Sequence, residues 1–313
     1  MAFNGVINRS DVGGIIPAEA SYELINTVAT EASHVMRLGR RLRDMTIYET
    51  DMPVLSALAT AYFPDGDTGL VETSEVNWDD VNVYAKDLAV LVPIPKNVLN
   101  DARIPIWSEI QPIMRTAAGK AIDNAMLYGT NKPSAWPSAI IVGALAASHN
   151  ISIADFDDLY AALLDESGLF STVEVDGFGI SGVIANLSMK GKLRGVRTTE
   201  GMPIFTRDPA IAGQYLLDGA PIYFPMNGAG SSTYHAIAGD WSQLVYSMRQ
   251  DIEFDIFTEG VIQDASGTIV FNLMQQRMAA MMLTLRLGFA LPNPINWVNS
   301  NSTTRYPFAY LVD

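Results

Sequence analysis

The sequence predicts an α+β fold, because helical and strand periodicities both occur and each occupies its own stretches of the chain. Apolar residues recur every three or four positions between Ile106 and Ala125, which is typical of an amphipathic helix. Apolar residues recur at every second position in two runs of opposite phase between Val81 and Val92, and again between Leu283 and Phe289, which is typical of strands. No internal repeat is evident, so the 313 residues are expected to form one large or two modest domains with a well-buried core.

The composition indicates a chain with more apolar surface than its charges account for. Hydrophobic residues make up 49% and charged residues only 17%. Either the core is unusually complete, or part of the apolar surface faces other subunits. No run of about 18 apolar residues predicts a membrane span. The first residues, 1–8, lack a basic region followed by an apolar run, so a soluble protein made in a cytoplasm is expected.

The residue inventory excludes several kinds of chemistry. The chain has no cysteine, which removes disulfides, thiolate metal sites and cysteine nucleophiles. Its three histidines, His34, His149 and His235, are far apart in sequence, and no metal site or cofactor is predicted. The net charge of −14 repels nucleic acid phosphates, although solubility is the simplest reason for such a charge.

Four short motifs approach a functional pattern, and each fails. Gly119-Lys120 lacks the earlier glycine and the Ser or Thr of a phosphate loop, so helix surface is expected. Asp65–Gly69 resembles the start of a calcium loop, but the sixth position is Leu70 instead of glycine and the twelfth is Val76 instead of glutamate, which leaves an acidic turn. Gly179–Gly182 misplaces a glycine of the nucleophile elbow, and Asn227–Ser232 matches no dinucleotide fingerprint and predicts a surface loop. No catalytic residue is predicted, and the chain is not expected to be an enzyme.

One basic cluster stands out in this acidic sequence. Arg37, Arg40, Arg41 and Arg43 fall within seven residues. Contacts to nucleic acid, salt bridges between subunits and simple solvation are all compatible with the pattern.

The first half of the chain predicts an arm, a helix and a long two-stranded excursion. Residues 1–17 are polar and turn-rich, and Ala18–Arg43 has helical periodicity. Met45–Pro95 has strand character around the turn formers of Phe63–Gly69. Such a hairpin has too little core to be stable alone, so it must pack on something else.

The clearest predicted helix runs to Tyr128, where Gly129 occupies the position of a helix stop. Pro112 either opens this helix or kinks it. Asn131–Pro137 then breaks all regular structure and indicates a domain boundary.

The second half mixes both periodicities. A helix is expected at Phe156–Leu164, behind a Ser152 cap and before a stop at Gly168. Strands are expected at Phe178–Ala185, 244–248, 252–256 and 283–289. Methionines 274, 278, 281 and 282 predict either core or an adaptable contact surface.

Six segments, taken in order, carry a resemblance to a known family. They are Ile15–Ser21, Met52–Ser56, Tyr84–Leu99, Asp123–Pro133, Ala238–Trp241 and Leu287–Pro292. In this order and spacing they resemble the major capsid proteins of tailed bacteriophages, the family with the Hong Kong 97 fold, over roughly Ile15 to Pro292.

The resemblance implies an architecture and a function. Residues 1–45 are then the N-terminal arm and helix, 46–92 the extended loop, 93–137 and 251–313 the peripheral domain with its spine helix, and 138–250 the axial domain. The chain is implied to self-assemble into the pentamers and hexamers of an icosahedral shell, which encloses double-stranded DNA without sequence-specific binding. The shell belongs to the virion and is assembled in the host bacterial cytoplasm, with scaffolding, portal and decoration proteins as further partners.

The resemblance also has consequences for individual residues. Contacts between subunits are expected at Arg37, Arg40, Arg41, Arg43, Tyr62, Phe63, Asp65, Asp67 and Trp78. Only fourteen residues precede Ile15, so any scaffolding segment is expected to be a separate protein or already removed. No lysine occurs before Lys86, so lysine–asparagine cross-links from the loop tip are not expected.

Two alternatives remain open at this point. An encapsulin, the shell protein of a bacterial nanocompartment, has the same fold and encloses cargo enzymes instead of DNA. A hydrolase or binding protein with an unrecognised site would instead be a stable monomer with a ligand in a pocket.

Overall fold

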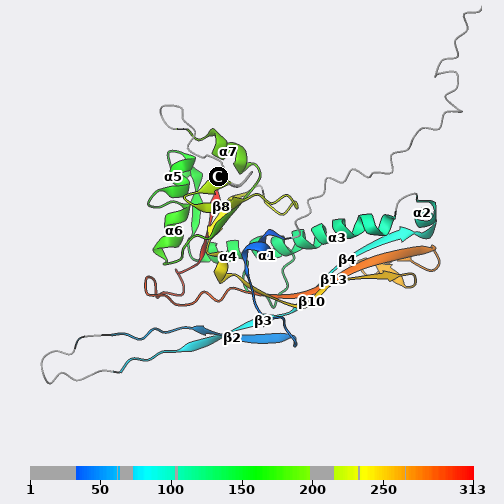
Figure 1. Cartoon of the computed structure of the whole chain (residues 1–313), viewed down its shortest axis with the longest axis horizontal. Coiled ribbons are helices and arrows are strands. Elements are labelled where there is room, and N and C mark those ends of the chain that lie inside the picture. The colour runs from blue at the N-terminus through cyan, green and yellow to red at the C-terminus, as the bar shows by residue number, and fades with distance from the viewer. Residues whose placement is uncertain are drawn as a thin grey trace, which may run out of the picture.

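An elongated four-stranded sheet forms one body of the molecule (Figure 1). In the computed structural model, which describes residues 33–61, 63, 73–102, 105–197, 215–231, 233–264 and 266–313, its strand order is β1-β10-β13-β4. The strands are β1 (Arg40–Arg41), β10 (Val245–Phe257), β13 (Met278–Ala290) and β4 (Lys86–Pro95). β10 and β4 pair antiparallel with β13, and β1 runs parallel to β10. The strands expected at 244–248, 252–256 and 283–289 are therefore confirmed, the first two as one strand with irregular register between Met248 and Glu253.

The long helix α3 (Ile106–Asp123) lies along this sheet (Figure 1). Its buried side chains, Met114, Ala118 and Ile122, pack into the core that also contains Leu283 and Leu285 of β13. The helix continues as a π-helical turn, Asn124–Tyr128, and stops at Gly129, whose φ of 77° only glycine adopts without strain. The predicted helix is confirmed to its last residue.

Pro112 lies inside α3 and does not open it. Its missing N–H removes one bond of the helix ladder. The Thr116 hydroxyl donates to the Pro112 carbonyl at 3.0 Å, which provides a local side-chain bond in this turn.

The far end of the elongated sheet carries a helix and a small hairpin. Helix α2 (Lys96–Asp101) follows β4, and β11 (Val261–Gln263) pairs antiparallel with β12 (Ile269–Asn272). A separate small core of Leu273, Met278 and Ala280 joins this hairpin to the sheet.

A six-stranded sheet forms the second body, in the order β5-β14-β9-β6-β8-β7. Its strands are β5 (Asn150–Ser152), β6 (Gly182–Ala185), β7 (Tyr215–Leu217), β8 (Ala220–Tyr223), β9 (Tyr234–Gly239) and β14 (Phe308–Val312). Helix α4 (Ile140–Ala146) packs on one face with the end of α3. Helices α5 (Leu159–Leu164), α6 (Leu169–Val175) and α7 (Met189–Gly195) pack on the other. Both faces are covered, so residues of β6, β9 and β14 alternate between two cores.

A two-stranded hairpin projects from beneath the elongated sheet (Figure 1). Strands β2 (Glu49–Leu55) and β3 (Trp78–Tyr84) pair antiparallel over seven residues each. The expected two-stranded excursion is present, but the strand Lys86–Pro95 is β4 of the elongated sheet and pairs with β13. The excursion therefore ends at Tyr84, and the boundary expected at residue 92 was placed too late.

Several expected elements have different limits in the structure. Residues 1–17 and most of the helix expected at 18–43 lie outside the described residues. Helix α1 comprises only His34–Leu38. The next residue, Gly39, packs so closely against Leu244 that a Cβ would lie 2.6 Å from Leu244 Cδ2. Arg40 and Arg41 then pair with β10, so the helix cannot continue. The helix was wrongly extended to Arg43.

The second body contains further corrections. Ser152 caps a single 3₁₀ turn, Ile153–Asp155, whereas α5 begins after its own cap at Asp158. Gly168 precedes α6 instead of ending α5, and the strand expected from Phe178 begins at Gly182.

The C-terminal part of the chain divides between the two bodies. Met278 and Met281 are buried, while Met274 is exposed, so the four methionines do not form one cluster. Residues 251–313 were expected to belong to one body, but β14 lies in the six-stranded sheet, so they are divided between two bodies.

Within the described residues, no helix is long and apolar enough to span a bilayer.

Candidate assembly surfaces

The hairpin β2–β3 is packed at its base and exposed toward its tip. Val83 is fully buried in a small core with Met45, Ala85, Val245 and Ala290. Beyond β2 and β3 the two arms of the hairpin remain hydrogen-bonded, because Ser56 N–H donates to the Asn77 carbonyl at 2.9 Å. Trp78 is 64% exposed and Phe63 is fully exposed. The outer half of the hairpin therefore carries aromatic side chains that the described part of its own chain leaves uncovered.

The base of the hairpin is tied to the sheet by specific contacts. The Lys86 amine donates to the Tyr48 hydroxyl and lies 4.9 Å from the centre of the Tyr48 ring. Trp136 Nε1–H donates to the Tyr84 carbonyl at 3.0 Å. At Gly288 a Cβ would lie 2.6 Å from Val83 Cγ1, so a side chain at this position of β13 would displace the hairpin core. These contacts fix the direction in which the hairpin leaves the body.

The four arginines are all exposed, but they are used in different ways. Arg41 forms an ion pair with Asp44 at 2.8 Å, and the hydrogen bond within this pair raises the pKa of the guanidinium. The Arg37 guanidinium lies 5.4 Å from the centre of the Tyr223 ring and so links α1 to β8 of the second body. The Arg43 carbonyl accepts from the Ser247 hydroxyl at 2.6 Å, while its side chain points to solvent.

The nine residues expected to contact other subunits do not form one site. Arg37, Arg40, Arg41 and Arg43 follow one another along α1, β1 and the next loop, whereas Phe63 and Trp78 lie on the hairpin. Tyr62, Asp65 and Asp67 lie outside the described residues. Their role in contacts between subunits remains a prediction.

An apolar patch at the far end of the elongated sheet was missed in the sequence. Six large side chains there are between 41% and 65% exposed: Ile256, Phe257, Val261, Ile269, Val270 and Met274. The signal was available, because two short β-branched runs flank the turn formers Asp264–Gly267 and predict a hairpin. Exposed apolar side chains in such number are frequent at surfaces that contact other proteins.

A buried carboxylate, Asp123, joins three parts of the chain. It is fully buried at the end of α3. Its Oδ1 accepts from the Ser33 hydroxyl at 2.5 Å and from Val35 N–H at 3.1 Å. Its Oδ2 accepts from His34 N–H at 3.1 Å and from Asn227 Nδ2 at 2.7 Å. Asp123 thus satisfies the first N–H groups of α1, which is the usual role of an N-terminal cap, from a distant part of the sequence.

This junction corrects the expectation for the glycine-rich segment 227–232. Asn227 is buried, and its Oδ1 also accepts from Ala229 N–H at 2.9 Å. The first residue of the segment, Asn227, therefore connects the two bodies, so the segment is not merely a surface loop.

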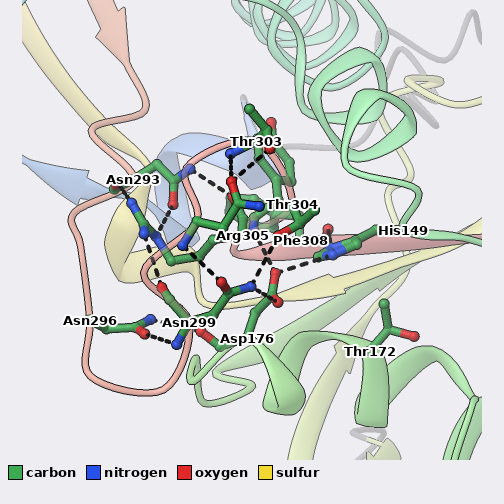
Figure 2. Close-up of polar contacts among 12 residues, drawn as sticks. His149, Thr172, Asp176, Asn293, Asn296, Asn299, Thr303, Thr304, Arg305 and Phe308 are labelled. Atoms are coloured by element: carbon green, nitrogen blue, oxygen red, sulfur yellow. Dashed lines mark hydrogen bonds and ion pairs between the residues drawn. The ribbon is translucent and has the colours of Figure 1, made fainter.

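A second buried carboxylate, Asp176, braces the long segment 291–307 (Figure 2). Oδ2 accepts from Tyr306 N–H at 2.7 Å and lies 3.2 Å from His149 Nε2. Oδ1 accepts from Asn299 Nδ2 at 2.8 Å, and the Asp176 carbonyl accepts from Asn296 Nδ2 at 2.7 Å. The segment has no helix or strand, and side-chain hydrogen bonds hold it in place.

Arg305 completes this brace from inside the segment. It donates to the carbonyls of Asn293 and Asn299, both at 3.0 Å, and Asn293 Nδ2 donates back to the Arg305 carbonyl at 2.8 Å. Burial lowers the pKa of Arg305, while the charge of Asp176 acts in the opposite direction. A buried charge with this many partners fixes one conformation of the backbone around it.

The described residues contain no arrangement typical of an enzyme. Ser181, from the failed nucleophile elbow, accepts from Trp241 N–H at 2.9 Å and has a structural role. Among the residues that the structure describes, no group of three or more His, Asp or Glu side chains is placed to hold a metal ion. Two hollows beside α3 are lined mainly by apolar side chains, and another lies between α4 and the segment 291–307.

A family profile and the sequence of a known protein each match most of this chain. The sequence profile described as the phage capsid family matches residues 13–295. The major capsid protein of Staphylococcus phage 80alpha is 25% identical over 262 residues, which cover 82% of this chain and 76% of that protein.

Solved structures from two phages have the same fold over nearly their whole length. The structure from Microbacterium phage Oxtober96 is 28% identical, with a TM-score of 0.82, and the match covers 98% of this chain and 99% of that one. The structure from Mycobacterium phage Bobi is 27% identical, with a TM-score of 0.79 and the same coverage. The α+β architecture expected from the sequence, a Hong Kong 97-like capsid fold, is thereby confirmed.

Proposed function

The chain belongs to the phage capsid family, and on that premise we propose that it forms the pentamers and hexamers of an icosahedral shell around double-stranded DNA. Its role is that of a structural subunit of a virion, and a capsid shell is assembled from many copies of such a subunit. A closed icosahedral shell requires five-fold positions, and a shell larger than the minimal size also has six-fold positions, so rings of both sizes belong to the proposal. Assembly in the host bacterial cytoplasm, alongside separate scaffolding, portal and decoration proteins, belongs to the same proposal.

The observation that carries the proposal is the hairpin β2–β3. Its outer half extends away from the body (Figure 1) and has no described core of its own. A two-stranded ribbon is marginally stable in water unless it packs on another surface. A neighbouring copy supplies that surface in a shell, and exposed Trp78 and Phe63 are then buried between subunits.

Two further features support a passive wall around DNA. The chain carries a net charge of −14, so the shell repels phosphates and does not hold the DNA tightly. The exposed arginines at 37, 40, 41 and 43 are few, and one of them is already paired with Asp44 within the subunit. The family also implies a non-enzymatic role, and we infer that the chain catalyses no reaction.

The experiment removes the outer hairpin without disturbing its base. Leu55 and Trp78 are directly paired, so a two-residue Asn-Gly turn can join them and replace residues 56–77. This variant keeps Val83 and the small core under the sheet. We expect a soluble subunit with unchanged circular dichroism that forms no closed shells by electron microscopy.

A control variant keeps the length of the hairpin and changes only its side chains. Residues 56–77 are replaced with a Gly/Ser segment of the same length, which is expected to impair assembly as strongly as the deletion. Normal shells from the shortened variant would contradict the proposed role of the hairpin. Wild-type particles that contain cargo protein and no DNA would favour the nanocompartment alternative.

A further inference from the structure

A small apolar platform lies at the turn of the braced segment 291–307. Trp297 is 75% exposed and Val298 is 68% exposed. Val175, the last residue of α6, is also 68% exposed. The backbone at Gly177, two residues later, runs so close to Val298 that a Cβ at position 177 would lie 2.8 Å from Val298 Cβ. Trp297, Val298 and Val175 are hereafter called the platform.

The platform is held rigid by polar contacts beneath it. Asn296 Oδ1 accepts from Val298 N–H at 3.1 Å and from Asn299 N–H at 2.8 Å, which closes a tight turn. Asn296 Nδ2 donates to the Asp176 carbonyl and ties this turn to the end of α6 (Figure 2). A surface that is ordered before binding loses little conformational entropy on association. The braced turn therefore loses less conformational entropy on binding than an unbraced surface loop would, which favours a contact site here.

The platform is continuous with the hairpin. Ile295 N–H donates to the Leu55 carbonyl at 3.2 Å, which joins the braced segment to β2. Leu55 is paired in turn with the exposed Trp78. In Figure 1 the braced segment lies directly above the hairpin, on the side toward which the hairpin extends beyond the body. The platform and the hairpin are therefore close enough for one partner to cover both.

We propose that the platform binds a second copy of this chain, and that this copy is the neighbour on which the hairpin lies. The inference rests on the proposed function, since it takes the occupant of the hairpin to be another subunit. Trp297 is the central residue of the contact, because tryptophan buries a large area with few rotatable bonds and is enriched among residues that dominate binding energy. Val298 and Val175 form the apolar surface around it.

The test compares assembly of full-length variants. Trp297→Ala is expected to raise the subunit concentration needed for half-maximal shell formation at least tenfold, measured by light scattering and sedimentation. Trp297→Phe, which keeps an aromatic ring, is expected to restore most of the assembly. Leu187→Ala removes an exposed apolar side chain of the second body outside the platform and is expected to assemble like the wild type.

A second measurement does not depend on assembly yields. The difference in tryptophan fluorescence between wild type and Trp297→Phe reports Trp297 itself. Acrylamide should quench this difference signal in free subunits and fail to quench it in closed shells. Normal assembly of Trp297→Ala, or a Trp297 that stays quenchable in shells, would overturn the inference, and the second outcome would leave the platform open to a different partner.

These results separate the inference from the proposed function. If wild-type chains form no shells and the hairpin deletion changes nothing, the proposed function itself fails. If the hairpin deletion abolishes shells while Trp297→Ala assembles normally, only the role of the platform is refuted.

Discussion

Substitution of Asp123 by Asn should loosen the junction between α1, α3 and the segment at Asn227. The carboxylate accepts four hydrogen bonds, from Ser33, His34, Val35 and Asn227. An Asn side chain keeps one oxygen, which accepts from two donors, and turns an NH₂ group toward the other two. The substitution keeps the volume of the side chain, so its effect reports hydrogen bonding and charge.

The expected size of the effect follows from the donors that lose their partner. Each buried donor left unsatisfied costs about 1–3 kcal/mol, so two of them cost about 2–6 kcal/mol. Removal of the buried charge offsets part of this cost. We expect a net loss of about 3 kcal/mol, which corresponds to about a hundredfold increase in local opening.

Hydrogen exchange measured by mass spectrometry is the appropriate assay, because the loss is local. Peptides that contain the amides of His34 and Val35 should lose about a hundredfold in protection. Peptides from β14, which lies in the other sheet, should exchange as in the wild type.

Two further variants make the test specific. Asp158→Asn is the matched control, because Asp158 caps α5 in an exposed position, where Asn caps equally well. In the double variant Asp123→Asn with Asn227→Asp, the hydrogen bond between residues 123 and 227 is kept with donor and acceptor exchanged. This variant should regain about 1 kcal/mol of stability, while the amides of α1 should still exchange faster than in the wild type. Unchanged protection of residues 34 and 35 in Asp123→Asn would refute the reasoning.

Three other predictions concern packing, cross-linking and pH. Gly288→Ala should destabilise the subunit by about 1–3 kcal/mol in a denaturant titration, because its Cβ would overlap Val83, and Val83→Ala in the same chain should restore part of the loss. Shells should separate into single chains in hot detergent, because the Lys86 amine is held by Tyr48 at the hairpin base; a ladder of multimers that disappears in Lys86→Met would contradict this. Burial raises the pKa of Tyr128 to about 12, with the charge of Asp123 adding to the shift. The unfolded tyrosine ionises near pH 10, so stability falls as pH rises from 10 to 12, and Tyr128→Phe should reduce this fall by about 2 kcal/mol in urea titrations.

The elements that could be predicted from sequence are those whose signal is local. Residues 106–128 repeat an apolar stripe and end at a glycine, and both features act within a few residues. The alternation in β13 is equally local. The strand at Lys86–Pro95 was recognised, but its partner was not, because alternation states which side chains share a face and says nothing about which strand lies alongside.

The elements that were misplaced depend on distant contacts. Helix periodicity continues through Arg40 and Arg41, but both residues pair with β10, which lies some two hundred positions later in the chain. Asp123 and Asp176 were not identified, because a buried carboxylate and an exposed one look alike in sequence. Asp123 lies on the same face of the helix as buried Gly119 and Met126, but the structure is needed to identify this face, because the apolar repeat between Ile106 and Ala125 follows another one.

The position of β14 in the six-stranded sheet has a consequence for the timing of protein synthesis. β14 lies between β5 and β9, yet β9 ends at Gly239 and β14 begins only at Phe308. A nascent chain must therefore be extended by almost seventy residues after β9 before the gap in this sheet is filled. Until then the edges of β5 and β9 stay unpaired, and the cores on both faces lack Phe308, Tyr310 and Leu311. A fragment released early by the ribosome cannot complete the body that α3 and α4 pack against. We therefore expect chains truncated before Phe308 to be excluded from the particle, because they lack the strand that completes this sheet.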